Sequence, residues 1–237
     1  DAMQPAAVVR VDGSAARAAD DLLAVEEPLE IRLQLETAVE VVRRTVAVTM
    51  RTPGDDAALA AGFLFTEGVL RDPADLKRVV PCGLPPADGQ APNVVRVVLR
   101  PGTPVDLARL ERHFYTSSSC GVCGKASIDA LRAVSRFPLP AATEAIDAAV
   151  VHALPATLAA AQPVFGRTGG LHAAALLDLG VALLAIAEDV GRHNAVDKLV
   201  GAALLAGRLP LHDRILFVSG RASFELVQKA AMALTMR

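Results

Sequence analysis

Two cysteines stand three positions apart in the segment 116–125, which reads TSSSCGVCGK. A glycine follows each of Cys120 and Cys123, so the backbone can come close to a bound group or a partner. Lys125 and the backbone amides of a helix that starts here favour the thiolate, which is the nucleophilic form of cysteine. Together with the four hydroxyl residues before Cys120, this pattern is typical of a reactive thiol.

Four interpretations of this cysteine pair stay open on the residues alone. Two structural cysteines spaced by chance would not usually have glycines beside them. A thioredoxin-like redox pair would come after an early strand of a βαβ unit, whereas this pair comes late in the chain. A zinc site needs two more ligands, and its candidates, His172 and His193, lie on other loops. Sulfur transfer through a persulfide accounts for an exposed thiol with a second cysteine beside it, and we favour this interpretation.

The remaining cysteine, Cys82, belongs to the loop PCGLPP at 81–86 and is interpreted as incidental. Three cysteines in 237 residues do not make a disulfide framework, which indicates a reducing cytoplasm as the compartment. No permanently bound metal is expected.

The segment 188–194, EDVGRHN, follows an expected buried strand and opens a helix. An arginine can clamp an anion there, and the amides of the helix start add to the attraction. A capping network joined by a surface salt bridge is the alternative interpretation. The candidate binding residues of this loop are Arg192, His193 and Asn194.

The segment 218–225, VSGRASFE, repeats this arrangement and predicts a second pocket for a phosphate or a carboxylate. It lacks the Gly-Lys-Ser/Thr ending of a Walker A loop, and a helix N-cap is the alternative role for Ser223. A third, glycine-rich turn at 166–172 ends on a histidine. The candidate binding residues of these two segments are Ser219, Gly220, Arg221, Gly169 and His172.

The first half of the chain predicts a small α/β domain over residues 1–113, with residues 1–20 as a loose leader. Alternating and β-branched residues indicate its strands. The run TPGDD at 52–56 is typical of a helix start with Thr52 as the cap, and Gly68 is typical of its left-handed end. The expected elements are strands over 29–35, 39–50 and 94–99 and helices over 57–65 and 72–79.

The second half predicts a layered α/β domain over residues 114–237. Its order of strand, loop and helix occurs twice, which predicts parallel pairing and gathers the loops at the carboxyl ends of the strands. Because the chain stops inside a helical pattern, we expect this domain to be truncated at its end. The expected elements are a hairpin over 173–177 and 181–187, a strand over 214–218, and helices over 125–135, 147–161 (interrupted near Pro155), 195–205 and 223–234.

Composition excludes several classes of protein. With 52% hydrophobic and 21% charged residues, the chain is not disordered. A net charge of -2, 3% aromatic residues and no Trp argue against a nucleic-acid partner. Residues 1–11 lack the features of a signal peptide, and the uncharged stretch 148–166 contains two prolines, so no membrane association is expected.

These segments together resemble the FdhD/NarQ family, the accessory sulfurtransferases of formate dehydrogenases. Five motifs occur in the order of the family, and five in order are highly specific although each alone is weak. They are RTPGDD at 51–56 with GFL and EG after it, SSCGVCG at 118–124, GGLH at 169–172, EDVGRHNAVDK at 188–198 and SGR at 219–221.

The resemblance implies two domains, of which the second has a cytidine-deaminase-like fold. It also implies that sulfur is accepted from a cysteine desulfurase and passed to the molybdenum of the bis-guanine-dinucleotide cofactor, before the cofactor enters apo formate dehydrogenase. Cys120 would carry the persulfide and Cys123 would assist or relay. The nucleotide of the cofactor, for which GDP is a mimic, would bind the loops at 192–194 and 219–221. Exposed apolar helices lead us to expect a homodimer.

Two other classes of function compete with this one. A zinc deaminase would need His-x-Glu and Pro-Cys-x-x-Cys, but no histidine here has Glu two positions later and Ser119 precedes Cys120. The sequence therefore argues against deamination. A non-covalent chaperone that binds the cofactor or a guanine nucleotide is the alternative. It explains the two anion loops, but it leaves the cysteine pair without a role.

Overall fold

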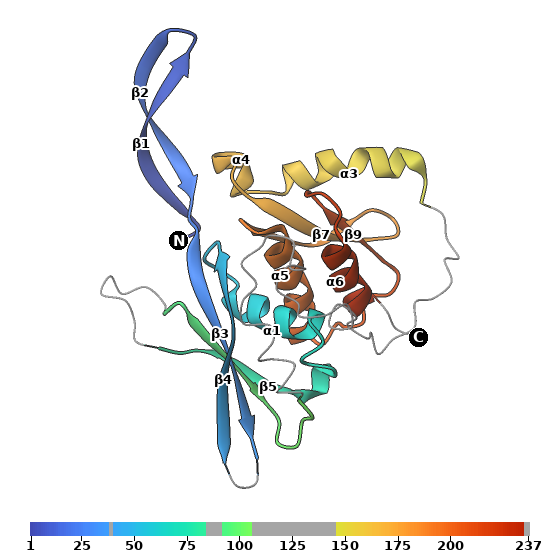
Figure 1. Ribbon diagram of the computed structural model, residues 1–237. Coiled ribbons are helices and arrows are strands. Elements are labelled where there is room, and N and C mark those ends of the chain that lie inside the picture. The colour runs from blue at the N-terminus through green and yellow to red at the C-terminus, as the bar shows by residue number, and fades with distance from the viewer. Residues whose placement is uncertain (38–39, 84–91, 106–145, 235–237) are drawn as a thin grey trace.

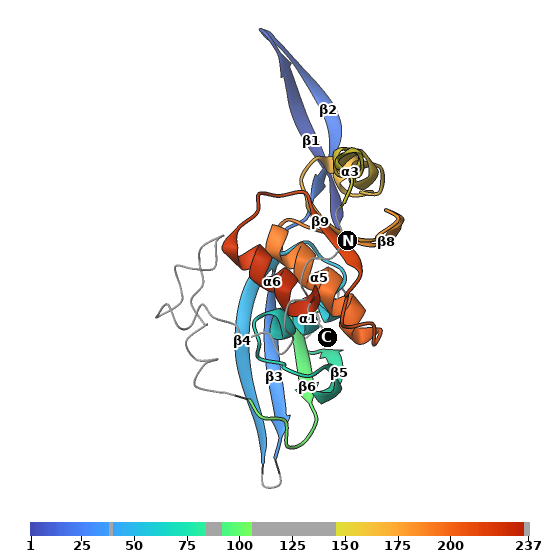
Figure 2. The ribbon, with the colours of Figure 1, turned by 90° about the vertical axis from the view of Figure 1, so that its right-hand side faces the viewer.

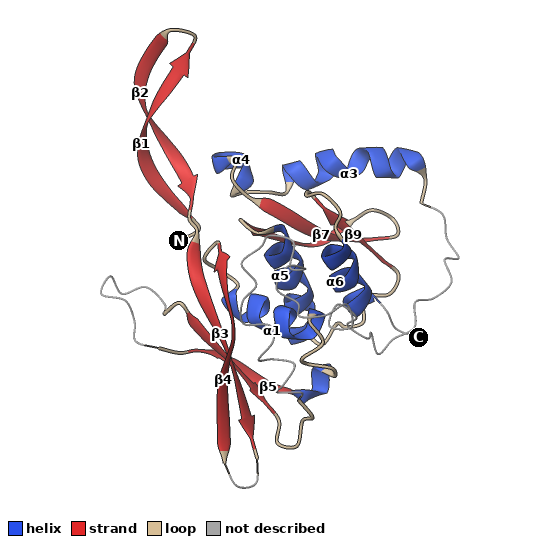
Figure 3. Cartoon of the chain, in the orientation of Figure 1, coloured by secondary structure: helices blue, strands red, loops and turns tan. Residues whose placement is uncertain are grey.

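The computed structural model describes residues 1–37, 40–83, 92–105 and 146–234. Cys120, Cys123, the helix expected over 125–135 and the predicted domain boundary at 113/114 lie outside the described residues. The described chain forms a two-stranded ribbon, a four-stranded sheet and a three-stranded sheet, with helices packed between and around the two larger sheets (Figures 1 and 3).

The N-terminal residues form an antiparallel ribbon, so the expectation of a loose leader over 1–20 is wrong. β1 (Met3–Asp12) pairs along its length with β2 (Ala15–Ala24), and Gly13 in the connecting turn has φ 59°. Most of the side chains are exposed, so the alternation of apolar and polar residues that marks a half-buried strand is weak here. Backbone hydrogen bonds rather than burial define this ribbon.

The first larger sheet has the strand order β4-β3-β6-β5. β3 is antiparallel to β4 and parallel to β6, which confirms the three strands predicted for this half. Leu29, Ile31 and Leu33 of β3 are fully buried, as their alternation predicts. The strand bounds are β3 (Glu27–Glu36), β4 (Val41–Arg51), β5 (Leu76–Pro81) and β6 (Val94–Leu99).

The helix expected over 72–79 is wrong. Only a 3-10 turn, η1 (Pro73–Asp75), forms there, and the Asp72 side chain caps it by accepting a hydrogen bond from the Ala74 amide. The following residues continue as the edge strand β5, antiparallel to β6. Pairing with β6 stabilises these residues, including two half-buried valines, more than an isolated short helix would.

α1 (Asp56–Thr66) confirms the helix expected over 57–65, but the predicted cap is wrong. Its N-cap residue is Asp55, with φ 56°, and no side chain caps the helix. The predicted cap, Thr52, instead donates its amide to Oδ2 of Asp189, at 3.2 Å, so it joins the two halves of the chain. The helix end is confirmed, because Gly68 follows α1 with φ 72°.

The second larger sheet has the strand order β8-β7-β9, and both strand pairs are antiparallel. The predicted parallel pairing is wrong because β7 lies between β8 and β9, which run in the same direction without pairing. The hairpin and the two later helices are confirmed. The bounds are β7 (His172–Asp178), β8 (Leu183–Asp189), β9 (Arg214–Val218), α5 (Arg192–Leu205) and α6 (Phe224–Leu234).

α3 (Ala148–Ala160) covers one face of this sheet and leads through a short loop to α4 (Phe165–Thr168). It is continuous, so the interruption expected near Pro155 does not occur. Pro155 is exposed, where water can satisfy the carbonyl group left without its donor. In the described ranges no helix combines the length and the apolar character needed to cross a membrane.

The main hydrophobic core lies between the two larger sheets (Figures 1 and 2). One cluster of buried side chains joins β3, β6 and α1 of the first half to β7, α5 and α6 of the second. The two halves therefore share a core. The division into two domains and the cytidine-deaminase-like fold of the second stay predictions.

The contact between α1 and α5 brings backbone against backbone. A Cβ on Gly62 would overlap the Asp197 carbonyl oxygen, and a Cβ on Gly201 would overlap the Ala58 carbonyl oxygen. Only glycine permits this separation. The contact fixes α5, and with it the loop that leads into Arg192, against the first half of the chain.

Candidate functional site

The three predicted loops meet at one edge of the second larger sheet. His172 begins β7 opposite Asp189, the last residue of β8. Ser219, just after β9, donates its amide to the Ala173 carbonyl oxygen at 3.0 Å and accepts the Ala173 amide on Oγ at 2.9 Å. The prediction that these loops gather at the carboxyl ends of β8 and β9 is confirmed, although the strand pairs are antiparallel.

A cavity of about 370 Å³ opens at this edge. Its volume lies within the range of small-molecule sites. Gly169 has φ 66° and ends α4, so the chain turns there along the wall of the cavity. Three of the lining residues are predicted binding residues. The lining consists of Gln162, Phe165, Gly169, Gly170, Leu171, His172 and Ser219.

Gln162 is a residue of this cavity that sequence reasoning missed. The residue is 6% exposed, and within the described residues its Nε2 has no hydrogen-bond partner. An unpaired buried amide costs about 1–3 kcal/mol, so an oxygen atom of a ligand would stabilise it. The one signal in the sequence is a glutamine in an otherwise weakly polar stretch at the end of an expected helix.

Arg192 and Gly220 lie side by side next to His172. A Cβ on Gly220 would be 3.0 Å from Cδ of Arg192 and 3.6 Å from Nδ1 of His172. The missing side chain at Gly220 therefore leaves room for the arginine stem and the imidazole. Arg221 is exposed and is not among the residues that line the cavity.

His193 faces α6 rather than the cavity. Its Nε2 lies 3.4 Å from Oγ of Ser223 and 3.4 Å from Oε2 of Glu225. Burial, followed by the positive charges of Lys229 and Arg192, lowers the pKa of His193 to about 4. The imidazole of His193 is therefore neutral near pH 7.

The low pKa of His193 predicts a contribution to stability that depends on pH. The ordinary pKa of a histidine is 6.5, so between about pH 4 and 6.5 this histidine carries a proton in the unfolded chain but not in the folded one. This contribution is complete above pH 6.5 and is lost as the pH falls toward 4. In urea unfolding at a series of pH values, the free energy of unfolding of His193→Gln should fall less steeply than that of the wild type across this window. Parallel curves would contradict the prediction.

Asn194 is buried against the first half of the chain. Its Nδ2 donates to the Met50 carbonyl oxygen at 2.7 Å and to Oδ1 of Asp189 at 2.9 Å, and its Oδ1 accepts from Thr49 Oγ1 at 3.3 Å. These bonds join α5 to β4. Asn194 therefore holds segments of the chain together, whereas the capping network offered as the alternative does not form, because no side chain caps the start of α5.

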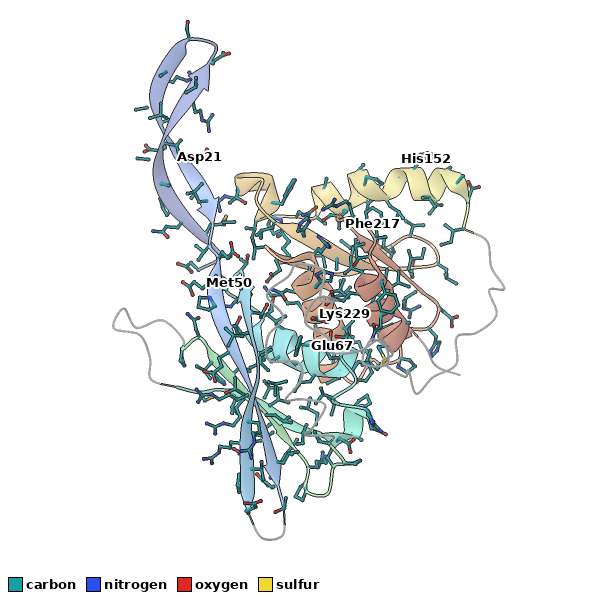
Figure 4. All side chains as sticks on the ribbon, in the orientation of Figure 1. Asp21, Met50, Glu67, His152, Phe217 and Lys229 are labelled. Atoms are coloured by element: carbon teal, nitrogen blue, oxygen red, sulfur yellow. The ribbon has the colours of Figure 1, made fainter. Side chains whose placement is uncertain are left out.

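A buried ion cluster lies below this loop, where α1, α5 and α6 meet. Lys229 Nζ donates to Oδ2 of Asp197 at 2.9 Å, to Oε1 of Glu67 at 3.0 Å and to Oγ1 of Thr66 at 3.0 Å (Figure 4). It also lies 5.3 Å from the centroid of the Phe63 ring. Burial alone would lower the pKa of Lys229, but Asp197 and Glu67 raise it above its usual value. The lysine is therefore charged.

The predicted nucleophiles, Cys120 and Cys123, lie outside the described residues. Cys82 lies within them and is half-buried with a free thiol. In the part of the chain that the structure describes, no three His, Cys, Asp or Glu side chains are grouped closely enough to hold a metal ion.

The chain is similar in sequence to proteins of known name. The model of the FdhD/NarQ family matches residues 24–235. The sulfur carrier protein FdhD of Streptomyces avermitilis is 51% identical over 228 residues, which is 95% of this chain and 78% of the relative. The protein of the same name from Mycobacterium tuberculosis is 50% identical over 218 residues, 90% of this chain and 76% of the relative.

A solved structure shares the fold. A formate dehydrogenase accessory protein from Desulfotalea psychrophila aligns with a TM-score of 0.66, over 98% of this chain and 81% of that one, at 22% identity. The mixed α/β architecture is therefore found in a second protein of distant sequence. Because the family model spans most of the chain and about half of the residues aligned with the curated relatives are identical, the chain belongs to the FdhD/NarQ family.

Proposed function

We propose that this chain is a sulfurtransferase that carries persulfide sulfur from a cysteine desulfurase to the molybdenum of the bis-guanine-dinucleotide cofactor, before the cofactor enters apo formate dehydrogenase. The relatives from Streptomyces avermitilis and Mycobacterium tuberculosis are named as sulfur carriers. Cys120 and Cys123 supply two thiols, which a reducing cytoplasm would keep free.

The observation that carries the proposal is the cavity where the predicted loops meet. Ser219 Oγ accepts the Ala173 amide, which leaves the hydroxyl hydrogen free to donate to a phosphate oxygen. Arg192 is not a lining residue of the cavity, but it lies next to Gly220 and His172 at the start of α5 and would add a positive charge beside the cavity. The buried Nε2 of Gln162 would donate to an oxygen atom of the ligand. These donors suit the phosphate oxygens of a nucleotide, and the guanine nucleotide of the cofactor would be part of the substrate.

The chemistry of the carrier balances with two thiols. The Cys120 thiolate attacks the outer sulfur of the desulfurase persulfide, the S–S bond of the donor breaks, and the desulfurase leaves as a thiolate. Cys120 then holds the persulfide. The Cys123 thiolate attacks the inner sulfur of that persulfide, forms a disulfide with Cys120 and releases hydrosulfide to molybdenum. A dithiol reductant returns both cysteines to thiols for the next cycle.

Mass spectrometry after incubation with a desulfurase and free cysteine tests the carrier role. The wild type should gain about 32 Da, the mass of one sulfur atom, and lose it on treatment with a thiol reductant. Cys120→Ser should gain nothing and should leave formate dehydrogenase activity at background, because the attacking thiolate is gone. Cys82→Ser is the matched control, and we expect it to behave as the wild type.

The alternative function, a non-covalent chaperone for the cofactor, gives the opposite result in the same experiment. A chaperone needs the cavity but no persulfide, so Cys120→Ser would still support formate dehydrogenase while Arg192→Ala would not. That outcome, or a labile sulfur that remains on Cys120→Ser, would overturn the assignment of Cys120.

A further inference from the structure

The first larger sheet turns one face toward the main core and the other face away from it. Successive side chains of a strand point to opposite faces, so Leu29, Ile31 and Leu33 of β3 pack into the core and the residues between them point away. The described α-helices all lie on the core side of this sheet (Figures 1 and 2). We term the opposite side the outer face. Its described residues are Glu30, Arg32, Gln34 and Glu36 of β3, Arg43, Thr45 and Val48 of β4, Lys77, Arg78 and Val80 of β5, and Val94, Arg96 and Val98 of β6.

The outer face carries an excess of positive charge, although the net charge of the whole chain is -2. Its two carboxylates are already paired. Glu30 accepts hydrogen bonds from Arg32 at 2.8 and 2.9 Å, and Glu36 accepts one from Lys77 at 2.8 Å. Three further arginines of this face form no ion pair with another described residue. They are Arg43, Arg78 and Arg96.

Arg96, in the middle of this face, occupies an unfavourable position. In the parallel register of β3 and β6 it lies directly opposite Arg32, and neighbouring strands are only about 4.8 Å apart, so the two like charges repel each other. Arg32 is held by Glu30, whereas Nε of Arg96 is buried and has no hydrogen-bond partner among the described residues. A position that costs stability in this way is typical of a site that a ligand completes. The missing partner of Arg96 is an anionic oxygen.

We propose that the outer face binds an acidic segment of a partner protein in an extended conformation, with Arg96 at the centre of the contact. The planar guanidinium group of arginine matches a carboxylate and binds it through two parallel hydrogen bonds. A nucleic acid fits this face less well, because the described residues of the outer face include no aromatic side chain on which a base could stack.

The spacing of the arginines suits an extended segment. Arg78 lies opposite Val98, which is two residues beyond Arg96 on β6, so the backbones of the two arginines are about 8 Å apart in the sheet. An extended peptide presents every second side chain on the same side, at intervals of about 6.8 Å. Successive carboxylates on one side of such a peptide can therefore reach Arg96 and Arg78. The main core separates this face from the second larger sheet, so a bound segment leaves the cavity beside Ser219 accessible.

Isothermal titration calorimetry with the full chain tests this contact, and the probe is an acetylated and amidated peptide of about ten residues in which Glu and Ser alternate. The wild type should bind this peptide at low ionic strength, and Kd should rise as salt is added, because salt screens exposed charges. Arg96→Gln and Arg78→Gln should each raise Kd at least about tenfold, since each removes hydrogen bonds to a charged group. A peptide with Gln in place of Glu should not bind.

Two controls separate the outer face from net charge and from folding. Arg208→Gln removes an exposed arginine beyond the end of α5 and changes the net charge by the same amount, so it should bind the peptide as the wild type does. In urea unfolding, Arg96→Gln should be at least as stable as the wild type, because it removes a cation that is repelled by Arg32 and lacks a partner at Nε. A residue that only supported the fold would give the opposite result.

Several outcomes would overturn the proposal. A wild type that does not bind the acidic peptide at low ionic strength would do so, and so would Arg96→Gln and Arg78→Gln variants that bind as the wild type does. An equal loss of binding in Arg208→Gln would show that net charge alone attracts the peptide. Tighter binding of a single-stranded oligonucleotide of the same charge would assign the face to nucleic acid instead. A marked fall in the stability of Arg96→Gln would give that arginine a structural role, which also contradicts the proposal.

Discussion

Gly201→Ala is expected to lower the free energy of unfolding by at least about 3 kcal/mol, at the upper end of the cost of overpacking. The added methyl group would overlap the Ala58 carbonyl oxygen and would lie 2.7 Å from the Gly62 amide nitrogen. Both are backbone atoms inside helix α1, so no side chain can rotate away and the helices would have to separate. That separation would open the shared core, in which Leu59 and Val200 are buried.

Urea unfolding followed by circular dichroism measures this effect. Gly166→Ala is the matched control, because no atom lies within 4 Å of its added Cβ and its φ is not positive, so it should leave stability almost unchanged. Gly62→Ala should be about as damaging as Gly201→Ala, and the two should not add because they disrupt the same contact. A Gly201→Ala protein as stable as the control would show that α1 and α5 do not pack backbone to backbone.

Elements whose burial alternates could be predicted from the sequence. β3 is an example, because Leu29, Ile31 and Leu33 are buried while the residues between them are not. β1 and β5 were beyond this reasoning. Their stability comes from pairing with another strand, and their side chains are mostly exposed or half-buried, so no period marks them.

Strand direction was also beyond local patterns. The order of strand, loop and helix correctly placed the loops after β8 and β9 at one edge, but it did not show that β7 would lie between these strands. The position of β7 depends on burial on both faces: Ala174 packs toward α5 in the main core, and Ala175 packs toward α3. The position of a strand in a sheet is therefore set by contacts between elements that are distant in the sequence.

Part of the candidate site could be predicted from the sequence and part could not. Gly169, His172 and Ser219 were predicted from the residue types in the loops beside the strands, and all three line one cavity. The role of Asn194 depends on Met50, which is far away in the sequence, and the unpaired amide of Gln162 becomes visible only in the folded chain. Contacts between distant segments leave no mark on a local motif.

Lys229→Met should also be strongly destabilising, with a loss of about 3–5 kcal/mol in the free energy of unfolding, the usual cost of removing one partner of a buried ion pair. Lys229 and Asp197 are 2% and 1% exposed at their side chains. Methionine would fill much the same volume but would remove the positive charge that lowers the pKa of Asp197, and among the described side chains Thr66 Oγ1 alone would still bond its buried carboxyl. Glu67 would lose the same ammonium group.

Urea unfolding of two further variants separates charge from packing. Lys77→Met removes a lysine from an ion pair of similar length, 2.8 Å to Glu36, but this pair is partly exposed, so stability should hardly change. The double variant Lys229→Met with Asp197→Leu should recover most of the loss, because no buried carboxylate is then left unpaired at that position. If the double variant were less stable than Lys229→Met alone, the cluster would act through specific hydrogen bonds to Thr66 and Glu67 rather than through neutralisation of Asp197. A Lys229→Met protein as stable as Lys77→Met would instead show that water reaches Asp197 and that the three helices do not depend on this charge.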